Sequence, residues 1–369
     1  MIVGMKKYTL TYSLLILAIG CLSLSASAQE AVFAQYYSSP VHLNPAMTGV
    51  FNGQYRMNAN YRQQWSGIFA DAPIRTIHAA FDTRVKVKRT DYFGFGLNAM
   101  NDETGAAGRV KTTRGNFSVA FQKQLGGGRY RNQSSFLSAG LQVGLGQQFG
   151  NMGNVWFDRQ YDSISNTVNM SLASGEVTPQ SNMYTDFNMG LLFYTIWDEN
   201  HSFYVGSSLH HLSRPEISFF GDSKEVLRRR ITFHGGGEIP FNKELSIMPS
   251  GMMSIQGPAM WAQLGANFRY TNKDWNEAAV RVGGAFRIAN KFISSVDKEG
   301  KSIQTGTSIL GDAFTATGII EINRLLIGAS YDIHASKIKL PTNGRGAWEL
   351  SIIYTVAEKR RARTDCPHF

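Results

Sequence analysis

The sequence predicts an all-β protein: a transmembrane antiparallel β-barrel of about 14 strands with a short plug-like N-terminal segment. Residues 54–65 show the pattern best, because apolar and polar side chains alternate with a period of two. The apolar face, interrupted only by Gln63, carries Tyr55, Met57, Ala59, Tyr61 and Trp65. The polar face carries Gln54, Arg56, Asn58, Asn60, Arg62 and Gln64. A tilted strand of about ten residues spans roughly 25 Å, which matches the apolar band of an outer-membrane barrel.

The composition agrees with this fold class. Aromatic residues make up 12% of the chain, charged residues only 17%, and there are 37 glycines. A soluble exported domain of this size would usually carry more charge. Beyond the first 28 residues there is no run of 18 apolar residues, so no transmembrane helix is expected. The net charge of +10 does not indicate nucleic-acid binding in an exported barrel.

Residues 1–28 have the pattern of a signal peptide. Lys6 and Lys7 precede an apolar stretch at 10–24, and Ala26-Ser27-Ala28 is a small-residue cleavage site. A lipoprotein signal is the alternative, because Gly20-Cys21 lies within the apolar stretch, but Ala18 stands where such signals prefer Leu. Cleavage after Ala28 leaves Cys366 without an intrachain disulfide partner. We expect it to be a loose thiol in the tail, and an intermolecular link is the alternative.

The same two-residue period recurs along the rest of the chain and places the barrel at residues 54–356. The predicted strands are 54–65, 74–84, 91–101, 112–123, 134–147, 184–195, 201–211, 229–240, 244–255, 260–270, 278–288, 312–322, 324–334 and 345–356. The count is even, as closed bacterial barrels require.

The connections predict an orientation. The three longest are 148–183, 212–228 and 289–311, and all three fall on the same side of the predicted barrel. Bacterial barrels keep their long loops outside the cell and their short turns in the periplasm. We therefore expect an outer-membrane protein with both termini in the periplasm.

Residues 29–53 precede the first strand and do not alternate. Asn44 suits a helix N-cap, Pro45 the first helical position, Ala46 the turn itself, and Gly49 a left-handed end. The segment is either a flexible arm or an ordered plug in the lumen. Phe33, Tyr36, Tyr37 and Phe51 favour the plug, because a free arm has little use for four aromatic side chains.

Two further regions are candidates for protein binding. Large apolar side chains occur in the predicted outer loops, at Trp156, Phe157, Tyr161, Phe219 and Phe220. They either bind a partner or fold back over the barrel. The tail at 357–369 is basic, with Lys359, Arg360, Arg361 and Arg363. It either docks an acidic periplasmic partner or is a solvated rim near anionic lipid headgroups.

No pattern of catalytic, cofactor-binding or metal-binding residues is found, so we expect neither an enzyme nor a cofactor. There is no Gly-x-Ser-x-Gly motif, and Gly126-Gly127-Gly128 lacks the Lys-Ser/Thr of a phosphate loop. His210 and His211 are adjacent on a predicted strand, so their side chains should face opposite sides and share no metal. One should lie in the lumen and the other near a membrane interface.

An ordered set of short motifs resembles the PorP/SprF family. The set comprises Gln35-Tyr36, Pro40, Asn44-Pro45-Ala46, Gly49, Tyr61-Arg62-Gln63-Gln64-Trp65, Phe81-Asp82, Gly94-Phe95-Gly96, Leu137-Ser138-Ala139-Gly140-Leu141-Gln142, Phe203-Tyr204-Val205-Gly206, Leu209-His210-His211-Leu212, Ser330-Tyr331-Asp332, Glu349-Leu350-Ser351, Tyr354 and the terminal Cys366-Pro367-His368-Phe369. The likeness covers nearly the whole mature chain. The Asn-Pro-Ala element is also similar, more weakly, to the hatch of FadL-type transporters.

The resemblance implies a role in the type IX secretion system of Bacteroidota. Family members act in secretion, surface attachment or localisation of exported proteins, including gliding-motility adhesins. The implied partners are a secreted substrate or cell-surface adhesin, components of the secretion machinery, and outer-membrane lipid. The alternative function is a FadL-like or porin-like transport channel.

Overall fold

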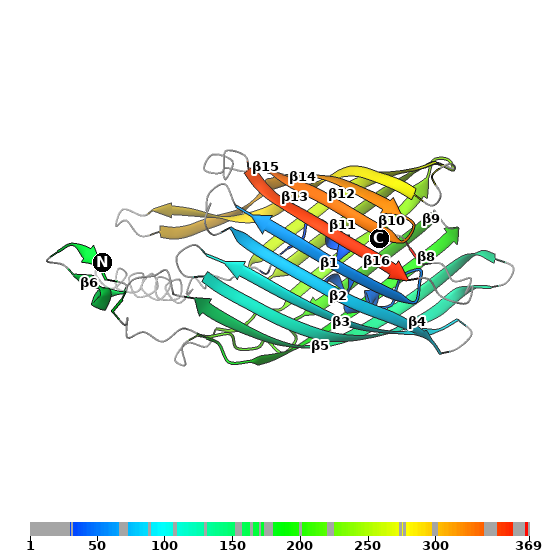
Figure 1. Ribbon diagram of the computed structural model, residues 1–369. Coiled ribbons are helices and arrows are strands. Elements are labelled where there is room, and N and C mark those ends of the chain that lie inside the picture. Colours follow the sequence, from blue (N-terminus) through cyan, green and yellow to red (C-terminus); the bar gives the residue numbers. More distant parts are fainter. Residues whose placement is uncertain are drawn as a thin grey trace, which may run out of the picture. The chain divides into compact units, whose positions relative to one another are not determined.

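The structure, a computed structural model, contains a closed barrel (Figure 1). It describes residues 30, 32–65, 73–87, 90–105, 109–128, 131–151, 157–162, 165–169, 171–172, 180–198, 201–219, 225–272, 275, 278–296, 302–335, 345–356 and 366–367. Within this part of the chain, no helix is long and apolar enough to cross a membrane.

Fourteen antiparallel strands form the barrel, and β1 pairs with β16 to close it. Their bounds are β1 Tyr55–Gln64, β2 Ile74–Lys86, β3 Tyr92–Thr104, β4 Arg109–Gly128, β5 Arg131–Asn151, β8 Tyr184–Asp198, β9 His201–His210, β10 Arg230–Pro240, β11 Leu245–Gln256, β12 Ala259–Thr271, β13 Ala278–Val296, β14 Ser302–Ile322, β15 Leu325–His334 and β16 Arg345–Val356. A separate two-stranded sheet, β6 Tyr161–Asp162 with β7 Thr167–Val168, follows the short helix η3 Asp158–Gln160. The predicted fold class is thus confirmed.

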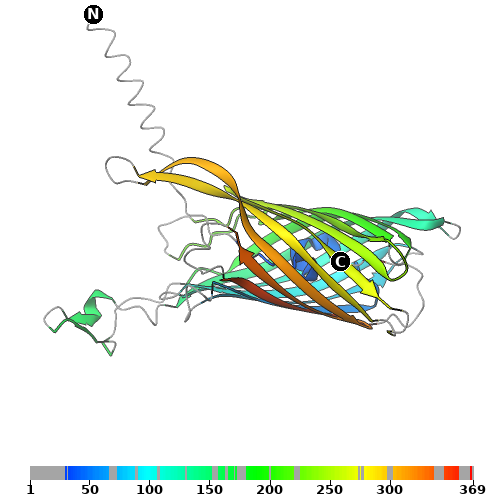
Figure 2. The ribbon, with the colours of Figure 1, turned by 90° about the horizontal axis from the view of Figure 1, so that it is seen from above.

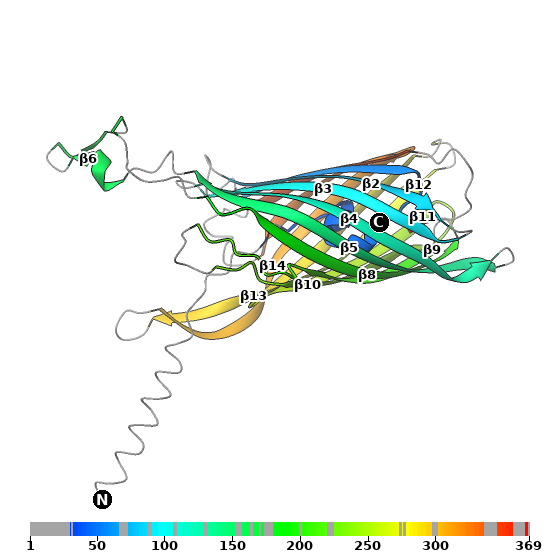
Figure 3. The same ribbon diagram turned by 90° about the horizontal axis from the view of Figure 1, so that it is seen from below.

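One predicted connection is wrong. Residues 289–311 are largely strand, because β13 and β14 stay paired out to Val296 and Ser302. The pairing shifts register between Arg287 and Ile288 and again after Ile293. A bulge inserts an extra residue and interrupts the period of two. The sequence alternation therefore stops at the bulge, although the strand continues beyond it. The extended β13–β14 hairpin projects beyond the neighbouring strands (Figure 3).

The alternation separates the two faces of the wall. On β1, Met57 is 49% exposed, whereas Arg56, Asn58, Asn60 and Arg62 are at most 4% exposed. Met57 pairs with Phe81 on β2, and both lie on the outer surface. An apolar outside and a polar inside are what a lipid-surrounded barrel needs.

Residues 32–53 lie inside this barrel and run along its interior (Figure 2). They form the short helices η1 Tyr36–Ser38, α2 Pro40–Leu43 and η2 Pro45–Met47. We call the end with the β5–β8, β9–β10 and β13–β14 connections the loop end, and the other the turn end. The segment begins at the loop end, where Ala34 contacts Glu349 near the start of β16, and leaves at the turn end to enter β1.

This path is not what strand parity alone suggests for the chain ahead of β1. An even number of strands puts the start of β1 and the end of β16 at one end. The segment before β1, however, crosses the lumen, so its first described residues lie at the opposite end. The even number of strands therefore determines at which end β1 starts. It does not determine where the residues before β1 lie.

Glycines on the wall make room for the segment. A Cβ on Gly140 would lie 2.3 Å from the carbonyl carbon of Pro45, and one on Gly94 would lie 2.2 Å from the carbonyl oxygen of Thr48. Both contacts are with backbone atoms, which cannot rotate aside as a side chain can. The motifs around these two glycines therefore reflect close approach of two backbones.

We expect Gly140→Ala to displace the segment and destabilise the folded barrel by about 1–3 kcal/mol, the usual effect of overpacking. The temperature at which the folded, fast-migrating form converts to the unfolded form in SDS gels measures this. Gly115→Ala is the matched control, because a Cβ on Gly115 meets nothing within 4 Å. Equal conversion temperatures for the two variants would contradict the close packing.

Candidate functional site

Residues 44–49 form a capped turn deep in the lumen. Asn44 is the N-cap of η2, and its Oδ1 accepts a hydrogen bond of 2.9 Å from the Ala46 amide. Its Nδ2 reaches the wall and donates to the carbonyl oxygens of Leu191 and Ser207 at 3.0 and 3.1 Å. Gly49 ends the turn with φ +76°, the left-handed conformation that favours glycine. One side chain thus both caps the turn and ties it to β8 and β9.

Wall side chains satisfy the backbone of the segment. Arg56 donates to the carbonyl oxygens of Met47 and Val50, and Asn58 donates to that of Ser38. Further donors on other strands reach further carbonyls: Gln263 to Ala34, Gln142 to Val41, Ser208 to Leu43, Ser138 to Ala46 and Gln122 to Thr48. A buried backbone needs such partners because no bulk water replaces them.

Not every polar side chain of β1 donates to a backbone carbonyl of the segment. Asn60 accepts a hydrogen bond from the Ser39 hydroxyl, and Arg62 binds carboxylates instead of backbone carbonyls. Asp82, which the sequence shows only as part of the Phe81-Asp82 motif, accepts from the Gly49 amide at 2.7 Å and pairs with Arg56 at 2.8 Å.

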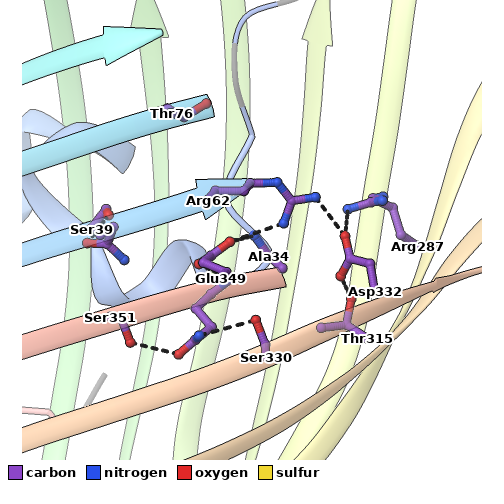
Figure 4. A network of polar contacts seen from close by, with 12 residues as sticks. Ala34, Ser39, Arg62, Thr76, Arg287, Thr315, Ser330, Asp332, Glu349 and Ser351 are labelled. Atoms are coloured by element: carbon purple, nitrogen blue, oxygen red, sulfur yellow. Dashed lines mark hydrogen bonds and ion pairs between the residues drawn. The ribbon is translucent and has the colours of Figure 1, made fainter. Parts of the chain in front are cut away.

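A second group of charges holds the start of the segment at the loop end (Figure 4). Glu349 accepts hydrogen bonds from the amides of Ala34 and Gln35 at 2.7 and 3.0 Å. Arg62 bridges Glu349 and Asp332 at 3.1 and 2.7 Å, and Arg287 also reaches Asp332, at 3.1 Å. The alternation of the sequence is enough to predict these ion pairs, because it places Glu349 and Asp332 on the inner face. Carboxylates on the inner face need cations on the inner face as partners.

Apolar packing complements these polar contacts. Met47 and Val50 are fully buried in a cluster that includes Phe136, Leu192 and Tyr194 of the wall. Burying side chains of this kind stabilises by roughly 1.5–3 kcal/mol each. Three cavities between segment and wall have volumes of about 10, 20 and 30 Å³, room for one or two water molecules each.

Ionisable side chains of the segment stay neutral. Burial, and then the neighbouring Tyr204, raises the pKa of the Tyr36 phenol well above its ordinary value of 10.0. Burial, and then the positive charge of Arg230, lowers the pKa of His42 well below its ordinary value of 6.5. The segment therefore adds no charge of its own at these two positions at neutral pH.

The predicted placement of His210 and His211 is wrong. Both are buried, at 3% and 2% exposure. β9 ends at His210, and His211 has φ +60°, which turns its side chain back into the lumen. There His211 Nδ1 lies 2.6 Å from Asp186. Among the described residues, no group of three or more His, Cys, Asp or Glu side chains could hold a metal ion.

Cys366 also differs from the expectation of a loose thiol. It is 3% exposed and belongs to the same apolar cluster as Val50 and Tyr194. Arg84 Nη1 lies 3.1 Å from its sulfur. Burial against the segment and β2 explains the difference.

The candidate loop residues are only partly described. Tyr161 is 37% exposed on β6, and Phe157 and Phe219 are half-buried. Gln160 organises the loop around η3, since it accepts from the Phe157 amide and donates to the Leu172 carbonyl. Trp156 and Phe220, and the tail residues Lys359, Arg360, Arg361 and Arg363, lie outside the described residues.

The closed apolar-surfaced barrel with a polar interior defines an outer-membrane β-barrel protein. Residues 25–354 match the family described as "Type IX secretion system membrane protein PorP/SprF". The chain belongs to this family. Family and fold together indicate a non-enzymatic outer-membrane barrel associated with type IX secretion. No curated protein sequence matches the chain.

Solved structures with a similar fold are outer-membrane barrels of low sequence identity. CdiB from Acinetobacter baumannii is 8% identical with a TM-score of 0.41, covering 82% of this chain and 60% of CdiB. CdiB from Escherichia coli is 9% identical with a TM-score of 0.42, covering 81% and 63%. The chain thus spans about three fifths of either CdiB chain. The P. putida toluene transporter TodX is 8% identical with a TM-score of 0.41, covering 85% and 93%.

We expect Arg62→Ala to destabilise the barrel by about 3–5 kcal/mol, because it leaves the buried Glu349 without its paired cation and Asp332 with Arg287 alone. Urea unfolding in detergent micelles measures this. Lys123→Ala is the control: its Lys123–Asp91 pair includes a lysine side chain that is 52% exposed. Asp91 itself is only 4% exposed, but with a half-exposed lysine the pair should contribute less than the fully buried pairs of Arg62. A loss for Arg62→Ala no larger than for the control would contradict a structural role for the charge group.

Proposed function

We propose that this barrel anchors or helps to export a protein secreted by the type IX machinery, such as a gliding adhesin, and keeps it at the cell surface. The observation that carries the proposal is the filled lumen. A chain segment bonded to the wall along residues 34–50 suits an attachment partner better than an open pore. Membership of the PorP/SprF family supports the same role.

Under this proposal the loop end faces outside the cell and the turn end faces the periplasm. The short turns at 241–244 and 323–324 and the end of β16 at Val356 lie at the turn end. The basic residues Lys359, Arg360, Arg361 and Arg363 follow Val356 and would meet acidic surfaces of periplasmic machinery there. The start of residues 32–53 would then lie toward the outside, although the segment is synthesised before the barrel.

The secreted partner would bind the loops after β5 and β9. Tyr161, Val168 and Leu172 are exposed apolar side chains on one short loop region, at 37%, 37% and 51%. Exposed aromatic and aliphatic side chains are common anchors of protein interfaces. The folded turn around Gln160 would present them with little loss of chain entropy on binding.

Deletion of residues 160–180 should abolish surface display of the secreted partner and leave a folded barrel in the outer membrane. Antibody labelling of the partner on intact cells measures display, and heat-modifiable migration verifies the barrel.

A cysteine replacing Ser165 in a Cys366→Ser background should react with an impermeant thiol reagent on intact cells, and one replacing Lys86 should not. Normal display after the deletion would refute loop recognition, and the reverse labelling pattern would invert the orientation.

A transport channel of FadL or porin type is the alternative function, and it would differ from an attachment protein in having a lumen that conducts ions. Removing residues 31–50 should raise single-channel conductance in planar bilayers from near zero to that of an open barrel. Asn44→Ala, which removes the cap and should cost about 1 kcal/mol, should give brief openings. High conductance of the intact protein would favour a channel, and equal conductance with and without the segment would show that it does not plug the barrel.

A further inference from the structure

The last described residues of the chain return to the barrel interior. Cys366 and Pro367 are both buried, although the preceding described residue, Val356, is the end of β16. Asn52 forms two hydrogen bonds with the backbone of Cys366: its Oδ1 accepts from the amide, and its Nδ2 donates to the carbonyl at 3.3 Å. Such paired bonds from one amide side chain hold a peptide backbone in a defined register.

The side chain of Cys366 is held separately from its backbone. Its sulfur lies 3.1 Å from Arg84 Nη1, and Arg84 itself stacks over the Tyr92 ring at 5.1 Å. Around them lie Val50 and Tyr194, in the cluster that also buries Met47. The seat of Cys366 and Pro367 is thus built from β2, β3, β8 and the N-terminal segment together.

This seat lies where the segment leaves the lumen. Asn52 joins the segment to β1, and the Gln54 amide donates to the Val356 carbonyl at 2.8 Å. The end of the segment, the start of β1 and the end of β16 therefore meet beside Cys366. A contact at this point would hold the end of the segment in place and oppose its movement out of the barrel.

We propose that Cys366–Pro367 is a C-terminal latch that locks the N-terminal segment at the turn end of the barrel. The latch joins the two ends of the barrel sequence through Asn52, so that the segment cannot slide without breaking it. The family match covers residues 25–354, and the latch lies beyond it, in the terminal motif Cys366-Pro367-His368-Phe369.

Thiol reactivity tests the latch directly, because Cys366 is the only cysteine outside residues 1–28. In the folded protein in detergent micelles, maleimide should react with Cys366 at least about tenfold more slowly than in urea. Asn52→Ala, which removes both backbone hydrogen bonds, should raise the rate in the folded protein by about tenfold. Asn242→Ala is the matched control, because Asn242 is an exposed asparagine that caps the β10–β11 turn at the same end.

Conductance tests whether the latch closes the barrel. Truncation after Asp365 should give brief channel openings in planar bilayers that the full-length protein lacks, while the barrel keeps its heat-modifiable migration. Three outcomes would each overturn the proposal: equal maleimide rates in folded and urea-unfolded protein, no difference between the Asn52 and Asn242 variants, or a truncated protein as closed as the full-length one.

Discussion

The structure depends on one constraint: a barrel whose inner wall is polar and whose lumen is filled must pair nearly all of its polar groups within the chain. Lipid outside dictates the apolar outer face, and strand periodicity then makes the inner face polar. Without a wide aqueous channel, those groups need partners. The backbone of residues 32–53 supplies carbonyls and amides, and the wall supplies Arg56, Asn58, Glu349 and Asp82 to match them.

Buried charged side chains fix the position of the segment along the barrel wall. A buried ion pair adds little net stability, because desolvation offsets the attraction, but it is costly to leave unpaired. Asp82 serves Arg56 and the Gly49 amide together, and Glu349 serves Arg62 and the Ala34 amide together. Each carboxylate thus couples wall to segment, one near each end. Sliding the segment by one residue would break both couplings at once.

The sequence predicts this barrel well because alternation is a local property. All 14 strands lie near their predicted positions, and the polar row of β1 lines the interior. Prediction fails where geometry departs from ideal period two. The bulge at Arg287 and Ile288 interrupts the alternation, so the long β13–β14 hairpin was not predicted. The left-handed backbone of His211 points its side chain into the lumen instead of outward. The contacts of Cys366 and of the start of the segment could not be foreseen, because they join residues about 300 apart.

A filled lumen also determines where function can reside. With Met47 and Asn44 completely buried in the interior, a large partner has access only to the two ends and the lipid-facing surface. The loop end carries the longest connections and exposed apolar side chains such as Tyr161, whereas the turn end has short turns such as 241–244 and 323–324. Exposed apolar side chains are common anchors of protein interfaces, so the proposed partner site belongs at the loop end. The segment runs from one end of the lumen to the other, and the contacts of Ala34 with Glu349 and of Asn52 with Cys366 hold it near both ends.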